Sequence, residues 1–181
     1  MKILIAYGTR YGTTKEIAHW MYERLPDGDH DVCPVEKVKS LEPYSHVIIG
    51  SPLYDDDLLE EVKTFIRERC SEFRKLHVGV FGVALHHLGK GLYGNPDGGL
   101  AYFDRFLKNL PVKPIYSRLL GGAIHPELLN DEDRQLLQRF YEKHGTEGIP
   151  FQQEAKKSEA WQFVEKFFQY CQVKEKLKKR I

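Results

Sequence analysis

Apolar residues gather in short runs along the chain, and these runs alternate with segments in which apolar residues recur at helical spacing. Runs in which apolar and polar residues do not alternate are typical of strands covered on both faces, as parallel strands are. We therefore predict strands over residues 3–7, 32–35, 47–50 and 78–84, and a fifth, less regular strand over residues 115–124.

The segments between these strands carry apolar residues three and four positions apart, which indicates amphipathic helices. Helices are predicted over residues 17–25, 58–67 and 100–110, and near the C-terminus around Trp161, Val164, Phe168 and Cys171. The link between the second and third strands, residues 36–45, is short and contains Pro43, so the alternation is weakest there. Residues 130–144 form an additional amphipathic helix that begins at an Asn or Asp.

Strands that alternate with helices predict a right-handed, doubly wound α/β sandwich of three layers. Five strands fit a parallel sheet in the order 2-1-3-4-5, with an extra helix before the C-terminal helix. The chain of 181 residues is long enough for one substantial core, and it has no internal repeat or linker. We predict a single domain over residues 1–181.

Charge and hydropathy narrow the class of partner. Twenty-seven Lys and Arg residues oppose 26 Asp and Glu residues, so a formal charge of +1 does not favour nucleic acid. No apolar run approaches the roughly 18 residues of a membrane span, and the N-terminus lacks a signal-peptide pattern, so we predict a cytoplasmic protein. The basic segment 174–180 either touches anionic lipid as a peripheral contact or complements the dipole of the last helix.

Cysteine spacing argues against disulfides and against a zinc site. Cys33, Cys70 and Cys171 lie far apart and form no C-x-x-C pair. We interpret them as buried or half-buried thiols, and we predict no metal site.

The loop Gly8–Thr14 follows the first predicted strand and leads directly into a helix. In a doubly wound sheet this is a ligand-binding position, and the N-terminus of a helix favours an anion. The loop fits neither G-x-x-x-x-G-K-[ST] nor G-x-G-x-x-G. Its hydroxyl groups, Gly12 and Arg10 predict a site for a terminal phosphomonoester. The competing interpretation is that the threonines only cap the N-terminus of the following helix and bind no ligand.

Residues 9–18, TRYGTTKEIA, resemble the FMN phosphate loop of flavodoxins. The form T-R-x-G-x-T-x-E-I-A is similar to that of the menaquinone-dependent protoporphyrinogen oxidases, a flavodoxin-like family of haem synthesis. A looser similarity continues at residues 47–51, Tyr54, residues 121–123, the extra helix and Trp161. The resemblance implies a flavodoxin-like fold that binds FMN, with its phosphate held by Thr9, Arg10, Tyr11, Gly12, Thr13 and Thr14.

The resemblance also implies that the flavin ring lies across the loops after the third and fourth strands. The predicted contacts are Ser51, Pro52, Leu53, Tyr54 and Asp55 in one loop, and Ala84, Leu85, His86, His87 and Tyr93 in the other. Tyr54 offers a flat face for stacking on the ring, or it is a surface aromatic beside a helix start. His86 and His87 are solvated loop residues or weak catalytic candidates for proton delivery, with a reference pKa of about 6.5.

An acidic triplet, Asp55 to Asp57, occupies the place where the family commonly has a glycine after the ring-contact residue. One interpretation is that Asp56 or Asp57 caps the next helix. The other is that the carboxylates face the ring and lower its potential by repelling a reduced, anionic flavin. The sequence leaves both open.

Three functions are compatible with these residues. The first is an FMN-dependent oxidoreductase that oxidises protoporphyrinogen IX or a related substrate with a quinone acceptor. The phosphate loop and the extra helix favour it. The alternative is a flavodoxin-type electron carrier that docks with redox partner proteins, although such carriers tend to be strongly acidic. The third is a flavin-free regulatory protein that has kept the fold.

Overall fold

The computed structural model describes residues 1–54, 57–85, 98–144 and 154–178. Its central sheet is made of β1 (Ile3–Tyr7), β2 (Asp31–Pro34), β3 (His46–Tyr54), β5 (His77–Ala84) and β6 (Tyr116–Gly121). These strands are parallel and lie in the order β2-β1-β3-β5-β6. Because β5 and β6 are the fourth and fifth of the parallel strands, the predicted order 2-1-3-4-5 is confirmed.

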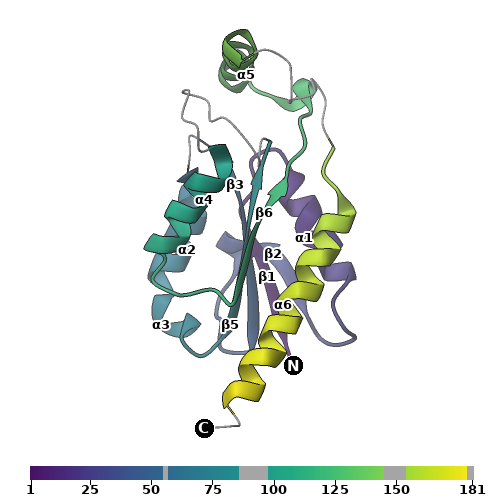
Figure 1. Ribbon diagram of the computed structural model, residues 1–181, viewed down its shortest axis with the longest axis vertical. Coiled ribbons are helices and arrows are strands. Elements are labelled where there is room, and N and C mark those ends of the chain that lie inside the picture. Colours follow the sequence, from purple (N-terminus) through teal and green to yellow (C-terminus); the bar gives the residue numbers. More distant parts are fainter. Residues whose placement is uncertain (55–56, 86–97, 145–153, 179–181) are drawn as a thin grey trace.

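Helices cover both faces of the sheet and form the outer layers (Figure 1). One face carries α1 (Thr13–Glu23) and α6 (Lys157–Lys178), and the other carries α2 (Glu60–Glu68), α3 (Cys70–Phe73) and α4 (Gly98–Asn109). Only a single turn of 3-10 helix, η1 (Val35–Lys37), follows β2. The predicted extra helix is present as α5 (Asp131–His144), which follows a second 3-10 turn, η2 (Pro126–Leu128).

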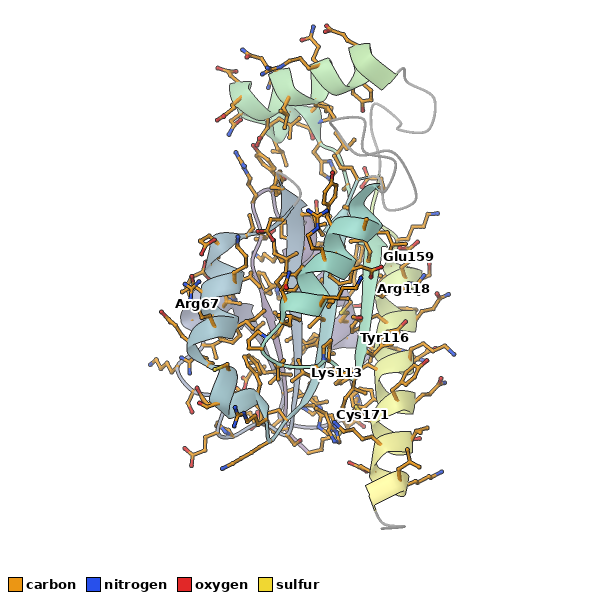
Figure 2. The ribbon with its side chains drawn as sticks, turned by 60° about the vertical axis from the view of Figure 1, so that its left-hand side comes forward. Arg67, Lys113, Tyr116, Arg118, Glu159 and Cys171 are labelled. Atoms are coloured by element: carbon orange, nitrogen blue, oxygen red, sulfur yellow. The ribbon has the colours of Figure 1, made fainter. Side chains whose placement is uncertain are left out.

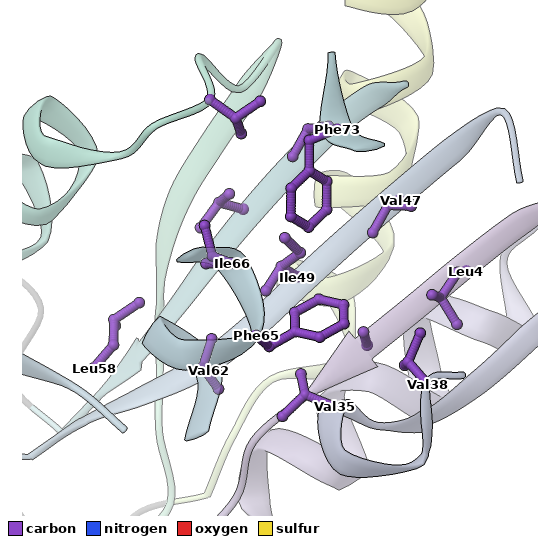
Figure 3. Packing of buried hydrophobic residues seen from close by; sticks show 14 of the residues in the cluster. Leu4, Val35, Val38, Val47, Ile49, Leu58, Val62, Phe65, Ile66 and Phe73 are labelled. Carbon is purple, nitrogen blue, oxygen red and sulfur yellow. The ribbon is translucent and has the colours of Figure 1, made fainter. Parts of the chain in front are cut away.

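The two faces of the sheet bury separate apolar clusters, and this explains why the strands do not alternate with polar residues. Leu4, Val47 and Ile49 point toward α2, where they pack with Val62 and Phe65 (Figure 3). A second set lies on the face of α1 and α6, and includes Ile5, Ile48, Ile17, Met21, Phe163 and Phe167. Fully burying one such side chain contributes about 1.5 to 3 kcal/mol, so the two clusters hold the layers together.

The third strand is longer than predicted. Residues 51–54 were expected in a loop, but they continue β3 because Ser51 and Pro52 remain in register with Gly82 and Val83 of β5. A two-residue strand, β4 (Asp57–Leu58), then pairs antiparallel with the end of β3. The predicted ring-contact segment is therefore a strand end and not a loop.

The capping role expected of Asp57 is wrong. Helix α2 has Leu59 at its N-cap and no side-chain cap, and Asp57 lies in β4 instead. The Asp57 carboxylate accepts the backbone N–H of Leu58 at 2.8 Å and pairs with Lys63 at 2.6 Å. Asp56 lies outside the described residues.

Within the described ranges, no helix has both the length and the apolar content needed to cross a membrane. Of the basic segment 174–180, residues 174–178 form the end of α6. Lys179 and Arg180 lie outside the described residues, so the predicted lipid contact stays a prediction.

Candidate functional site

The carboxyl ends of β1, β3 and β5 meet at one edge of the sheet, as parallel strands require. In Figure 1 this is the upper edge, and the two chain termini lie at the opposite end. The predicted phosphate loop and the start of the predicted ring-binding segments therefore lie at the same edge. Helix α5 lies beyond this edge (Figures 1 and 2).

The loop between β1 and α1 is held by its own backbone and one threonine. The Gly8 N–H donates to the Gly50 carbonyl at 2.9 Å, which fixes the start of the loop beside β3. The Gly12 N–H donates to Thr9 Oγ1 at 3.0 Å, which closes the loop before the helix begins. Thr9 therefore keeps a hydroxyl proton with which it can donate to a ligand.

Gly12 gives the loop its conformation. Its φ of 92° lies in the left-handed region, which glycine adopts at little cost. A Cβ at Gly12 would meet no atom within 4 Å, so the space beside the loop is open. No side chain of the described residues caps α1 at Gly12. The first N–H groups of a helix have no acceptor within it, so this end of α1 can bind an anion.

The threonines at the start of α1 differ in exposure. Thr13 is half-buried, whereas Thr14 is only 1% exposed and lies in the first helical turn. Together with Thr9, they bring three hydroxyl groups to one loop. One hydroxyl group is enough to cap a helix, and none of these three caps α1 through a side-chain hydrogen bond.

Helix α5 is joined to this loop through Asp133, a residue that sequence analysis did not select. Its carboxylate accepts the Tyr11 hydroxyl and forms an ion pair with Arg10, with Nη2 and Oδ2 2.9 Å apart. The Asn130 N–H donates to Tyr11 Oη at 3.2 Å, and Asn130 Oδ1 accepts the Asp133 N–H at 2.8 Å. The positive charge of Arg10, a loop residue, is thus partly neutralised by a carboxylate of α5.

Tyr54 packs under Arg10 at the end of β3. The guanidinium carbon lies 4.9 Å from the centre of the Tyr54 ring, and the Tyr11 ring lies 6.3 Å away. Burial, and next the Asp133 carboxylate, raise the pKa of the Tyr54 phenol, so it stays neutral. Partial burial lowers the pKa of Arg10, but Asp133 and Tyr11 outweigh it, so the net shift is upward. Tyr54 is therefore held in place, and its stacking on a flavin stays a prediction.

Ser51 points into the protein. It is 1% exposed, its hydroxyl donates to the Pro52 carbonyl at 2.9 Å, and its Oγ accepts the Leu59 N–H at 3.1 Å. Leu53 packs against the apolar cluster beneath α2. The side chains of Ser51 and Leu53 thus support the strand end, and the predicted ring contacts at Ser51, Pro52 and Leu53 stay predictions.

The second predicted ring-binding segment is described only at its beginning. Ala84 ends β5, and its carbonyl accepts the Gly122 N–H at 2.9 Å. Leu85 follows and is 36% exposed. Asp55, His86, His87 and Tyr93 lie outside the described residues, so their predicted roles stay predictions.

A pocket of about 480 Å³ lies beside α5 and not at the loop. Its lining comes from η2, Leu129 and one side of α5, including Leu137 and Tyr141. None of the residues of the β1–α1 loop lines it. This pocket is a feature of the extra helix, separate from the predicted phosphate site.

The geometry at the sheet edge agrees with a family match. A family model described as the flavodoxin domain matches residues 4–148. The chain belongs to the flavodoxin domain family. The match covers β1, the loop, the whole parallel sheet and α5, so the flavodoxin domain includes every described part of the candidate site.

Solved structures show the same flavodoxin fold. The flavodoxin of Streptococcus pneumonia TIGR4 is 20% identical, with a TM-score of 0.51 over 78% of this chain and 96% of that chain. A short-chain flavodoxin associated with a non-canonical PDU bacterial microcompartment is 17% identical, with a TM-score of 0.51 over 78% and 95% of the two chains. No curated protein matches this chain in sequence. At these identities the likeness establishes the fold alone.

Proposed function

We propose that this flavodoxin-domain chain binds FMN by its phosphate at the β1–α1 loop and carries electrons between redox partner proteins. The observation that supports it best is the start of α1, which has no side-chain cap and follows a left-handed glycine with open space beside it. Helix N–H groups at such an end favour a phosphate. Membership of the flavodoxin domain family supports FMN as the source of that phosphate.

Different groups of the loop make different contacts with the phosphate. The N–H groups of the first turn of α1 and the hydroxyls of Thr9, Thr13 and Thr14 donate to the phosphate oxygens. Arg10 lies close enough to Asp133 that its charge is partly neutralised, which moderates its pull on the phosphate. The bound FMN supplies the redox chemistry, and the protein supplies its position and electrostatic surroundings.

Acidic residues beside the end of β3 support a docking role. Asp57, Glu60 and Glu61 follow the predicted ring-contact segment, and Lys63 pairs with the first two. Lys63 and, at 3.9 Å, Arg67 offset part of this negative charge, and Glu60 remains 68% exposed in its side chain, so a basic partner can reach it. Complementary charges at such a surface accelerate transient association, as electron carriers require.

An FMN titration tests the loop assignment. Quenching of FMN fluorescence gives the Kd of the wild type and of the Gly12→Val, Thr14→Ala double variant. We expect the variant to bind at least tenfold more weakly, since each lost charge-assisted hydrogen bond costs about 1.5 to 3 kcal/mol. Thr64→Ala, which removes a half-buried hydroxyl that donates to Glu60 on α2, is the matched control and should leave the Kd unchanged. An unchanged Kd in the double variant contradicts the assignment.

A second candidate function is two-electron oxidation of protoporphyrinogen IX or a related substrate, with a quinone as acceptor. The anchoring of α5 to the loop through Asp133 favours it, because α5 adds a surface beyond the sheet edge for a larger substrate. An anaerobic assay of FMN-loaded protein with protoporphyrinogen, with and without a quinone, separates the two. Quinone-dependent turnover supports the enzyme. No turnover, together with two separate one-electron steps in a reductive titration, supports the carrier.

A further inference from the structure

The end of the sheet opposite the FMN loop carries a cluster of three potential metal ligands. His46 and His77 are the first residues of β3 and β5, and they are direct partners in the parallel register. Cys171 projects from α6 toward the same place, near the lower end of that helix in Figure 2. The Gly8 N–H bonds to Gly50, four residues along β3 from His46, and strands rise about 3.3 Å per residue, so this cluster lies roughly 13 Å from the start of the FMN loop.

The fold brings these side chains together for a simple reason. Side chains alternate along a strand, so His46 lies on the same face as Ile48, the face that α6 covers. On α6, residues four apart share a face, and the buried series Phe163, Phe167 and Cys171 runs down toward the strand starts. His46 packs against the Phe167 ring with the ring centres 6.0 Å apart.

We propose that His46, His77 and Cys171 bind one zinc ion. One ligand atom from each residue lies within 4.8 Å of the other two. His46 Nε2 and His77 Nδ1 are 3.1 Å apart. Two nitrogens on a tetrahedral zinc ion lie about 3.3 Å apart, given Zn–N bonds of about 2.05 Å, so the distance between these nitrogens suits the ion, and the rings must turn until both lone pairs point at it. A set of imidazole and thiolate ligands favours zinc over magnesium or calcium.

The hydrogen bonds around His46 determine which of its ring nitrogens carries the lone pair that a metal would use. The Ser45 hydroxyl donates to the Lys2 carbonyl at 3.2 Å, so its oxygen accepts the N–H of His46 Nδ1 at 2.8 Å. This tautomer leaves Nε2 as an acceptor, and it takes the N–H of His77 Nδ1 at 3.1 Å, a proton that a zinc ion would replace as His77 changes its tautomer. A second partner that fixes the ring and the tautomer in this way is the usual support of a metal-binding histidine.

Protonation determines what metal binding must displace at this buried place. Burial, and next the neighbouring His77, lower the pKa of His46 to about 4, so no proton competes for its nitrogen near neutral pH. Burial raises the pKa of Cys171 to about 11, so zinc must displace the thiol proton, which is released to solvent. Two neutral imidazoles, a thiolate and Zn²⁺ carry a net charge of +1. Glu175, one turn after Cys171 on α6, provides a carboxylate nearby.

A bound zinc ion would join three separate elements. It links the starts of β3 and β5 to the last turns of α6, which are otherwise held there by apolar packing. His77 is half-buried, whereas His46 and Cys171 are 6% and 3% exposed. The metal therefore enters from the side of His77, where a water molecule can complete the tetrahedron. The spacing of the three cysteines does not predict this site, because two of its ligands are histidines.

Cobalt is the probe for the test, because a thiolate bound to Co²⁺ produces a charge-transfer band and tetrahedral Co²⁺ absorbs strongly in visible light. The full chain, freed of metal by a chelator, is titrated with Co²⁺ and then with Zn²⁺. We expect one Co²⁺ per chain, a thiolate band, and its loss as Zn²⁺ displaces the cobalt. Free zinc at 100 times its Kd should raise the Tm by about 5 to 10 °C.

Variants assign the ligands. Cys171→Ala should abolish the thiolate band, and His77→Gln should weaken binding at least tenfold. Cys70→Ala is the matched control for the thiol, and the His86→Gln, His87→Gln double variant is the control for the histidine pair; both should bind as the wild type does. Binding of FMN, at the other end of the sheet, shows whether His77→Gln is folded. If Cys171→Ala does not fold, the result for His77→Gln decides the test.

Three results would overturn the proposal. They are the absence of binding at micromolar Co²⁺ and Zn²⁺, binding without a thiolate band, and binding that the control variants abolish but His77→Gln does not.

Discussion

Arg10 Nη2 lies 2.9 Å from Asp133 Oδ2, and this ion pair joins the β1–α1 loop to the extra helix α5. The Asp133 side chain is only 11% exposed, and the same carboxylate accepts the Tyr11 hydroxyl. Arg10, the cation of the proposed phosphate loop, thus already has a carboxylate partner. We therefore expect the affinity for FMN to depend on α5 as well as on the loop.

Removing the Asp133 charge should strengthen FMN binding. In Asp133→Asn, Arg10 is released toward the phosphate and a nearby negative charge is lost. We expect the Kd for FMN to fall about threefold to tenfold at low salt, with less effect at high salt. Asp131→Asn, on the same first turn of α5, is the control with the same change in net charge. A weaker FMN complex in Asp133→Asn would mean that the carboxylate positions the loop and does not oppose the phosphate.

Replacing Gly12 should destabilise the loop through the backbone alone. A Cβ at this position meets no atom within 4 Å, but the φ of 92° is unfavourable for any residue with a Cβ. Urea unfolding should give Gly12→Ala a free energy of unfolding about 1 to 2 kcal/mol lower than wild type. Asn tolerates the left-handed region better, so Gly12→Asn should lose less. Equal losses in both variants would contradict this explanation.

Ser51 should matter for stability, because its hydroxyl joins β3 to the start of α2. Removing it in Ser51→Ala leaves the Leu59 N–H and the Pro52 carbonyl without their partner. A buried group left unpaired costs about 1 to 3 kcal/mol, and we expect a loss of that size in urea unfolding. Ser40→Ala removes an exposed hydroxyl that accepts the Glu42 N–H, and it should cost less. A loss in Ser51→Ala no larger than in Ser40→Ala would show that the strand end does not need this hydroxyl.

Tyr44 should contribute stability that disappears in alkali. Its hydroxyl donates to Asp31 Oδ2 at 2.7 Å, and burial, followed by this hydrogen bond, raises its pKa to about 12. Between about pH 10 and pH 12 the unfolded chain has released this proton and the folded chain has not, so folding stability falls as the pH rises. The stability difference between wild type and Tyr44→Phe should shrink by about 1 to 2 kcal/mol across this range. A constant difference would contradict the assigned pKa.

The sequence predicted the sheet well because buried parallel strands leave a direct signal. The uninterrupted apolar runs around Ile5, Ile48 and Val80 mark the three central strands, and the order of the five parallel strands is confirmed. The signal failed at Ser51–Tyr54, where polar and ring-bearing residues indicated a loop. Pairing with β5 and β4 overrides that local preference. Helix α3 was missed because a single turn of four residues has no periodicity to detect.

The candidate site was predictable only in part. The loop Gly8–Thr14 was found from local chemistry, since its glycines and hydroxyls are neighbours in the chain. The contact of Asp133 with Arg10 and Tyr11 could not be found this way, because it depends on how α5 packs against a distant loop. His46 and His77 did leave a signal, in that each directly precedes an apolar run. Parallel register then places them side by side.

The central claim is that the β1–α1 loop recognises the phosphate of FMN, and calorimetric titration with FMN and with riboflavin tests it most directly. Riboflavin has the same ring without the phosphate, so the ratio of the two Kd values isolates the contribution of the loop. We predict one FMN site per chain and a Kd at least 100-fold lower than that of riboflavin, or about 2.7 kcal/mol. Equal affinities for the two flavins, or no heat of binding with FMN, would contradict the account.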